Sequence, residues 1–201
     1  FLRIESVTPD AKKSFDFLEK LFKKYNFEIH RVKFGSADTI EVENMFAIIG
    51  SGGPHLNFAG HVDVVPPGEL NSWKHPPFSG HIEDGIIYAR GAEDMKGAVI
   101  ASIVAGINYY ERMDSKGTLS YMLTGDEEGV AINGTKPLIK WVNDQGIKIN
   151  DCIVTEPTNK ELIGDNIKIG RRGSLSCDLR IIGSDWNCLL YTSPSPRDLS
   201  T

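Results

Sequence analysis

The sequence lacks the features of a disulfide-stabilised secreted protein. Its 201 residues include only three cysteines, which show neither paired spacing nor a Cys-x-x-Cys motif. Widely spaced, unpaired cysteines fit a reducing compartment, because disulfide frameworks and thiolate zinc sites both need cysteines at matched spacings. The composition therefore argues against a disulfide framework and against a thiolate metal site.

Long basic runs and long apolar runs are also absent. No basic run exceeds two residues and the formal net charge is −5. Nucleic-acid and anionic-membrane partners both require a concentrated basic face, so we expect neither. The most apolar stretch, residues 98–107, is too short to cross a bilayer. The N-terminus shows no signal-peptide pattern, and since it has no starting Met we expect it to begin inside a reading frame.

Hydrophobic periodicity predicts strands that alternate with helices. The expected helices cover residues 9–25, 95–112 and 134–143, with Thr8 as the N-cap of the first helix and the second one well buried. The expected strands cover residues 27–34, 45–49, 55–60, 85–89, 117–124 and 151–155, followed by an extended pair over 168–182. This alternation predicts an α/β fold, with a mostly parallel or mixed sheet flanked by helices on both faces.

Acidic and histidine-containing clusters follow several of these predicted strands. His61 and Asp63 follow one strand, the acidic run 126–128 follows another, and Glu156 follows a third. Asp94 stands just before the long apolar helix. Ligands of open α/β sheets bind at the carboxyl ends of the strands, so we expect these clusters to converge there.

The residue types favour a metal site with catalytic positions left open. Imidazole together with carboxylates suits zinc, cobalt or manganese, and one carboxylate can bridge two ions roughly 3.5–4 Å apart. Asp63 lies two residues from His61 in extended chain and can orient the imidazole. Of the adjacent Glu127 and Glu128, one can bind metal while the other remains a general base.

Each cluster also has a purely structural interpretation. A single His-x-Asp is usually structural, and an Asp-Glu-Glu run is usually a solvated loop. Asp94 could be a favourable charge at a helix N-terminus, and Glu156 before a proline could be a turn residue. These interpretations weaken together, because all the clusters fall at one predicted edge.

The order of the motifs resembles the zinc-dependent deacylase and exopeptidase family. His-x-Asp at 61–63 is followed by Gly-Ala-x-Asp-Met-Lys-Gly at 91–97, Asp-Glu-Glu-Gly at 126–129 and Glu-Pro at 156–157. The resemblance spans residues 6–183. Within the family, the segments at 6–10, 60–66, 73–78 and 164–175 are most similar to the succinyl-diaminopimelate desuccinylase branch.

The resemblance implies a role for each residue. His61 and Glu156 would bind the first metal, Glu128 the second, and Asp94 both, with the Asp94–Met95 peptide cis. Asp63 would orient His61 and Glu127 would be the general acid/base. Arg172, with Arg171 as the alternative, would contact a substrate carboxylate. The arginine pair could equally be a solvated domain junction.

The resemblance also implies an activity, a cofactor and partners. The enzyme would hydrolyse N-succinyl-LL-2,6-diaminopimelate to succinate and LL-2,6-diaminopimelate in bacterial lysine biosynthesis, with two Zn²⁺ per subunit or Co²⁺ as a substitute. Its only expected partners are the small-molecule substrate and, at full length, a second copy in a cytoplasmic homodimer. The alternatives are another deacylase or carboxypeptidase of the family, such as acetylornithine deacetylase, and a non-catalytic metal-binding protein.

The sequence departs from the family pattern towards its end. We expect residues 1–170 to be the N-terminal portion of the catalytic domain and 171–183 the start of a dimerisation or lid domain. Residues 184–201 resemble translated adaptor or vector sequence, a natural disordered C-terminus being the alternative. A later Gly-His motif and the histidine for the second metal are missing, so we expect negligible activity from this chain and tighter binding at the first metal.

Overall fold

The computed structural model describes residues 1–112 and 117–170. The chain divides into two compact units, Phe1–Asn159 and Lys160–Thr201. In the described part of the second unit, residues 160–170, there is no helix or strand. There the Asp165 carboxylate accepts hydrogen bonds from the backbone N–H groups of Lys160, Glu161 and Leu162. All the elements below belong to the first unit.

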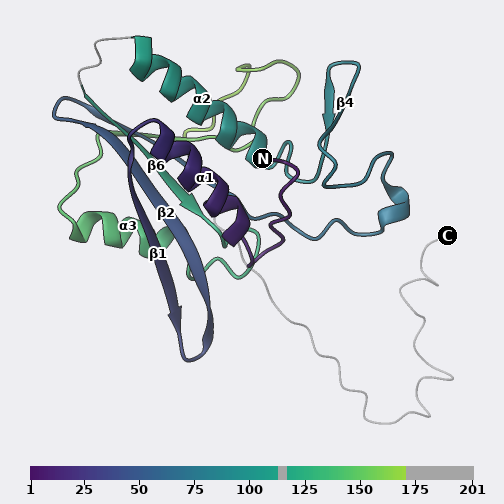
Figure 1. Cartoon of the computed structure of the whole chain (residues 1–201), viewed down its shortest axis with the longest axis horizontal. Coiled ribbons are helices and arrows are strands. Elements are labelled where there is room, and N and C mark those ends of the chain that lie inside the picture. The colour runs from purple at the N-terminus through teal and green to yellow at the C-terminus, as the bar shows by residue number, and fades with distance from the viewer. Residues whose placement is uncertain (113–116, 171–201) are drawn as a thin grey trace, which may run out of the picture. The chain divides into compact units, whose positions relative to one another are not determined.

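A five-stranded mixed sheet forms the centre of the first unit (Figure 1). Its strands, in spatial order, are β1 (Glu28–Ser36), β2 (Thr39–Ser51), β6 (Gly117–Thr124), β3 (His55–His61) and β7 (Asp151–Val154). β2 runs antiparallel to both β1 and β6, whereas β3 runs parallel to both β6 and β7. A separate hairpin pairs β4 (His81–Glu83) with β5 (Ile86–Tyr88), and a short 3₁₀ helix, η1, covers Leu70–Ser72. The expected α/β fold with a mixed sheet is confirmed.

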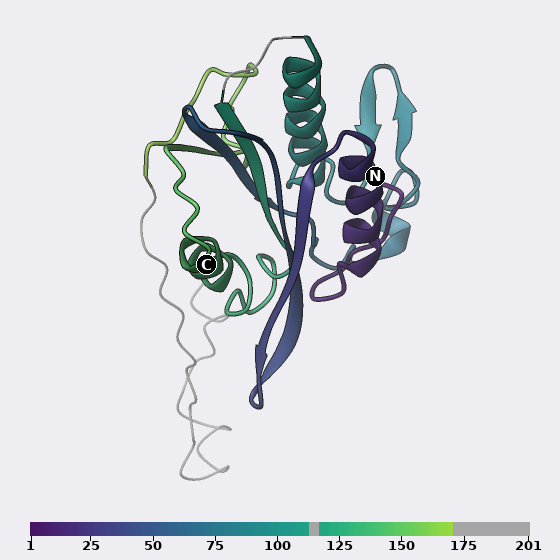
Figure 2. The ribbon, with the colours of Figure 1, turned by 60° about the vertical axis from the view of Figure 1, so that its left-hand side comes forward.

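Helices cover both faces of the sheet (Figure 2). α1 (Lys12–Lys24) and α2 (Lys96–Arg112) lie on one face and α3 (Thr135–Asp144) lies on the other. Alternation along β2 separates the two layers: Met45 and Ala47 join the core under α1 and α2, while Phe46 joins the core under α3. Side chains alternate along a strand, so each central strand contributes to both cores.

The first helix begins later than predicted. Residues at helical spacing, Phe15, Leu18 and Phe22, are fully buried, and burial of each contributes roughly 1.5–3 kcal/mol. The predicted N-cap at Thr8 is wrong, since α1 starts at Lys12. Val7 instead bridges to Val64, and the Thr8 N–H donates to the Val64 carbonyl at 3.0 Å. This pairing holds the segment in an extended conformation beside the loop after β3.

The second helix is less buried than its composition predicted. It packs against β6 so closely that a Cβ on Gly106 would lie 2.1 Å from the Tyr121 hydroxyl. Yet Val104 and Tyr109 on its outer face are 49% and 53% exposed. The expectation of a well buried helix is wrong because only one face meets the sheet. Among the described residues, no helix is long and apolar enough to span a membrane.

The predicted strands are present, with shifted ends. The prediction over 117–124 matches β6, and those over 27–34, 45–49, 55–60 and 151–155 fall within or overlap β1, β2, β3 and β7. The prediction over 85–89 contains β5, but its partner β4 was not predicted. The structure does not describe residues 171–201. The predictions that fall there are most of the extended pair over 168–182, the domain boundaries at 171 and 184, and the roles of Arg171 and Arg172.

Candidate metal centre

Three parallel strand ends bring the predicted residues to one edge of the sheet. In the β3/β6 pair His61 lies opposite Thr124, and in the β3/β7 pair Ala59 lies opposite Val154. Since the three strands run in the same direction, the residues that follow them emerge side by side. His61 ends β3, the run 126–128 follows β6, and Glu156 follows β7.

Carboxylates gather around one nitrogen of the His61 imidazole. Its Nε2 atom lies 2.9 Å from Asp94 Oδ1, 3.7 Å from Glu156 Oε1 and 3.8 Å from Glu127 Oε2. Asp94 reaches the cluster from the loop before α2, and the Asp94–Met95 peptide is cis, as the resemblance implied. Residues that are far apart in sequence therefore converge on one point.

The cluster contains two overlapping sets of potential ligands. His61, Asp94 and Glu128 form one set and His61, Glu127 and Glu156 form the other, with ligand atoms within 4.8 Å of one another in each. This donor set of one imidazole and several carboxylates fits zinc and other borderline divalent cations. His61 is 1% exposed whereas Asp94 and Glu127 are 52% and 48% exposed, so one side of the centre is open.

Asp63 is fully buried beside the His61 ring. The His61 Nδ1 atom lies 2.9 Å from the Asp63 backbone carbonyl oxygen and 3.6 Å from its carboxylate. That carboxylate accepts hydrogen bonds from the backbone N–H groups of Glu127 and Glu128, at 3.1–3.3 Å. One side chain thus links the loop after β3 to the acidic loop after β6.

The carboxylates make the centre favourable for positive charge. Burial by itself lowers the pKa of His61, but hydrogen bonds to Asp63 and the nearby carboxylates outweigh it and raise the pKa to about 9. Burial and the negative charge of Asp94 raise the pKa of the Glu128 carboxyl. Negative charge contributes to both shifts, and a bound cation would offset that charge.

Lys96, to which the sequence pattern assigned no role, anchors the start of α2 to the N-terminal segment. It is fully buried and donates hydrogen bonds to the Ile4 carbonyl at 2.7 Å and to the Ser6 hydroxyl at 3.1 Å. Burial lowers its pKa to about 8. These bonds tie the start of α2, and with it Asp94, to the N-terminal segment. The feature of the sequence that could have indicated this role is a lysine at the first position of an otherwise apolar helix.

A known protein family covers the segment that contains the cluster. Residues 57–193 match peptidase family M20/M25/M40. The chain belongs to this family. The match contains His61, Asp94, Glu127, Glu128 and Glu156, so the whole cluster lies within the M20/M25/M40 region.

The chain is also similar to enzymes that share one name, succinyl-diaminopimelate desuccinylase. It is 47% identical over 184 residues to the succinyl-diaminopimelate desuccinylase of Bradyrhizobium sp. (strain BTAi1), covering 90% of this chain and 48% of the relative. The enzyme of the same name from Rhodopseudomonas palustris (strain TIE-1) shows the same identity and coverage. The chain thus spans about half the length of the relatives it matches.

Solved structures support the M20/M25/M40 fold. A metallo-carboxypeptidase of the M20 family, Sso-CP2 from Sulfolobus solfataricus, superposes with a TM-score of 0.66 at 23% identity, covering 77% of this chain and 35% of that one. Human carnosine dipeptidase 1 gives 0.65 at 21% identity, with 77% and 36% coverage. At these identities the likeness concerns the fold.

Proposed function

We propose that this chain is the metal-binding portion of a dinuclear amide hydrolase that cleaves N-succinyl-LL-2,6-diaminopimelate. The observation that carries the proposal is the gathering of Asp94, Glu127 and Glu156 within 4 Å of His61 Nε2. The substrate is inferred from the name of the relatives that are 47% identical over most of the chain.

The residues divide into those that hold metal and one that moves a proton. His61, Asp94 and Glu156 would hold the first ion, and Asp94 and Glu128 the second. When bound, such ions polarise an amide carbonyl and make water easier to deprotonate. Glu127 is half exposed on the open side of the centre, where its carboxylate would accept a proton from water and deliver it to the leaving amine.

Further parts of the proposal concern the longer protein. Arg172, or Arg171, would contact a carboxylate of the substrate, and two Zn²⁺ per subunit would be bound, with Co²⁺ as a substitute. The working enzyme would be a cytoplasmic homodimer. The widely spaced cysteines support a reducing compartment, and the mild net charge of −5 supports a small-molecule partner rather than a nucleic acid.

The test compares substrates on the full-length, zinc-loaded protein. Hydrolysis of succinyl-diaminopimelate should exceed that of acetylornithine by at least about 100-fold in kcat/KM, a difference of about 2.7 kcal/mol in transition-state binding. Preference for acetylornithine would assign a different substrate within the family. Zinc binding without hydrolysis of either amide would instead favour a non-catalytic metal-binding protein.

A further inference from the structure

A second group of potential metal ligands lies outside the centre described above. His75 comes from the loop before β4, while His81 and Glu83 belong to β4 itself. Their ligand atoms lie within 4.8 Å of one another. We propose that these three residues bind a borderline divalent cation, with Zn²⁺ as the representative ion.

The local backbone places the three side chains on the same side. His81 and Glu83 are two residues apart in a strand, so both side chains point to one face. The His75 and His81 rings stack with centroids 3.8 Å apart, and His75 Nε2 lies 3.4 Å from Glu83 Oε2. Tetrahedral zinc with bonds of about 2.1 Å needs ligand atoms about 3.4 Å apart. Each imidazole lone pair lies in its ring plane, so one of the two stacked rings must turn before both nitrogens face the same ion.

The surroundings hold the histidines in place. Tyr88 of β5 lies opposite His81 in the hairpin, and its ring meets the His75 ring edge-on at 4.9 Å. This contact keeps His75, which is only 20% exposed, against the strand. These contacts hold both histidines beside Glu83, so metal binding requires a turn of the rings rather than a movement of the backbone.

Lys74 forms an ion pair with the Glu83 carboxylate. Its ammonium group pairs with Glu83 Oε2 and lies 5.1 Å above the Tyr88 ring. Hydrogen bonds from Lys74 and then His75 hold the pKa of Glu83 below its usual range. A cation must displace Lys74 from Glu83. Removing the lysine charge should consequently tighten metal binding.

A bound ion would add a link within the segment 75–83, which Arg3 and Arg90 already contact through the carbonyls of Ser79 and Pro77. The ion would join His75, in the loop before β4, to His81 and Glu83 at the two ends of β4. It would thereby cross-link residues 75–83, which include the turn that precedes β4. Ile82, Ile86 and Ile87 are 48–67% exposed, so the hairpin buries little apolar surface of its own. A cross-link of this kind should protect the hairpin against local opening.

Counting bound ions in the full chain tests the proposal directly. Equilibrium dialysis against Zn²⁺ should show one ion fewer in His81→Gln than in the parent chain. The control is His30→Gln, because His30 lies on β1 beside Glu28 and outside the group; it should keep every ion. Lys74→Gln should bind the ion more tightly than the parent. Equal ion counts in His81→Gln and the parent would overturn the proposal.

Hydrogen exchange supplies an independent measurement. Zinc at 100 times its dissociation constant should slow exchange of the β4–β5 amides by up to about 100-fold in the parent. The slowing should persist in His61→Ala, which removes the main centre, and vanish in His81→Gln. Loss of the slowing in His61→Ala, or its absence in the parent, would contradict a separate hairpin site.

Discussion

At the residue scale, Asp63 connects the two loops that carry the proposed metal ligands. Its buried carboxylate accepts N–H groups from Glu127 and Glu128, and its carbonyl faces the His61 ring. Replacing it with Ala leaves these buried donors without their acceptor and frees the acidic loop. We expect Asp63→Ala to weaken zinc binding at the main centre about 10–100-fold, as for other residues that orient ligands.

Competition titration with a zinc-binding dye would measure this loss. Asp63→Asn is the informative intermediate, since its amide oxygen can still accept one hydrogen bond, and it should lose less affinity than Asp63→Ala. Asp38→Ala, at an exposed turn, is the control and should bind like the parent. Unchanged affinity in Asp63→Ala would show that the loops hold their positions without this link.

Glu127 and Glu128 are neighbours with different predicted roles. In the full-length protein, Glu127→Gln should lower kcat by about 10²–10⁴ while leaving the zinc content unchanged, because a general base is lost but no ligand. Glu128→Gln should instead reduce the number of bound ions. Parallel metal analysis and steady-state kinetics distinguish the two. If Glu127→Gln instead loses bound ions and Glu128→Gln keeps them, Glu127 is the ligand and Glu128 the base. The structure allows this result, because Glu127 lies in one group of potential ligands with His61 and Glu156.

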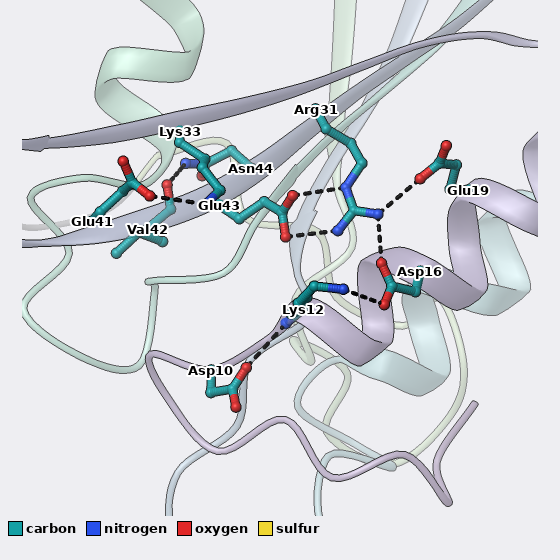
Figure 3. Close-up of polar contacts among 10 residues, drawn as sticks. All are labelled: Asp10, Lys12, Asp16, Glu19, Arg31, Lys33, Glu41, Val42, Glu43 and Asn44. Carbon is teal, nitrogen blue, oxygen red and sulfur yellow. Dashed lines mark hydrogen bonds and ion pairs between the residues drawn. The ribbon is translucent and has the colours of Figure 1, made fainter.

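At the element scale, one arginine joins α1 to the β1–β2 hairpin (Figure 3). Arg31 on β1 makes a two-pronged contact with Glu43 on β2, at 2.7 Å for each pair of atoms. It also donates to Asp16 and Glu19 on α1, at 2.6 and 2.8 Å. Its side chain is 21% exposed, so the network is partly shielded from solvent. The arrangement fixes the helix against the edge of the sheet.

Removing this arginine should destabilise the fold. Arg31→Met leaves three carboxylates without their shared cation, and we expect a loss of about 1–3 kcal/mol in the free energy of unfolding, measured by urea denaturation. Lys33→Met is the matched control, because Lys33 makes an exposed pair with Glu41 on the same hairpin; it should change stability little. An Arg31→Met variant as stable as the control would show that the network contributes nothing.

The same network predicts how the difference depends on pH. Hydrogen bonds from Lys12 and Arg31 lower the pKa of Asp16 below its ordinary 3.8, and those from Lys23 and Arg31 lower the pKa of Glu19 below 4.5. Groups with a lowered folded pKa stabilise the protein above their unfolded pKa, and this stability is lost as pH falls through the folded value. The Arg31→Met effect should therefore be full at neutral pH and shrink in acid.

At the scale of the whole molecule, metal should contribute to stability. Without a cation, several carboxylates crowd around His61, and a ligand at 100 times its dissociation constant stabilises the native state by about 2.7 kcal/mol. For a domain of this size that corresponds to a rise of roughly 5–10 °C in Tm on zinc addition, reversed by a chelator. Calorimetry would measure it, and His61→Ala should lose most of the shift.

Much of the architecture follows from local patterns. The apolar spacing of Phe15, Leu18 and Phe22 predicted α1, and the run 117–124 predicted β6 to the residue. Local patterns failed at Thr8, because the pairing of Val7 with Val64 depends on a loop more than fifty residues away. They also failed for β4, since a three-residue strand carries too little periodicity to detect.

The sequence by itself determined which residue types end the parallel strands, and hence that an imidazole and carboxylates meet at one edge. Only the tertiary structure decided their detailed pairing. Asp94 lies 33 positions from His61 along the chain, yet its carboxylate lies 2.9 Å from the His61 ring. The Asp63 carboxylate accepts hydrogen bonds from the acidic loop and lies farther, at 3.6 Å, from the imidazole. Contacts of a few ångströms depend on strand register and on loop paths, which spacing along the chain does not specify.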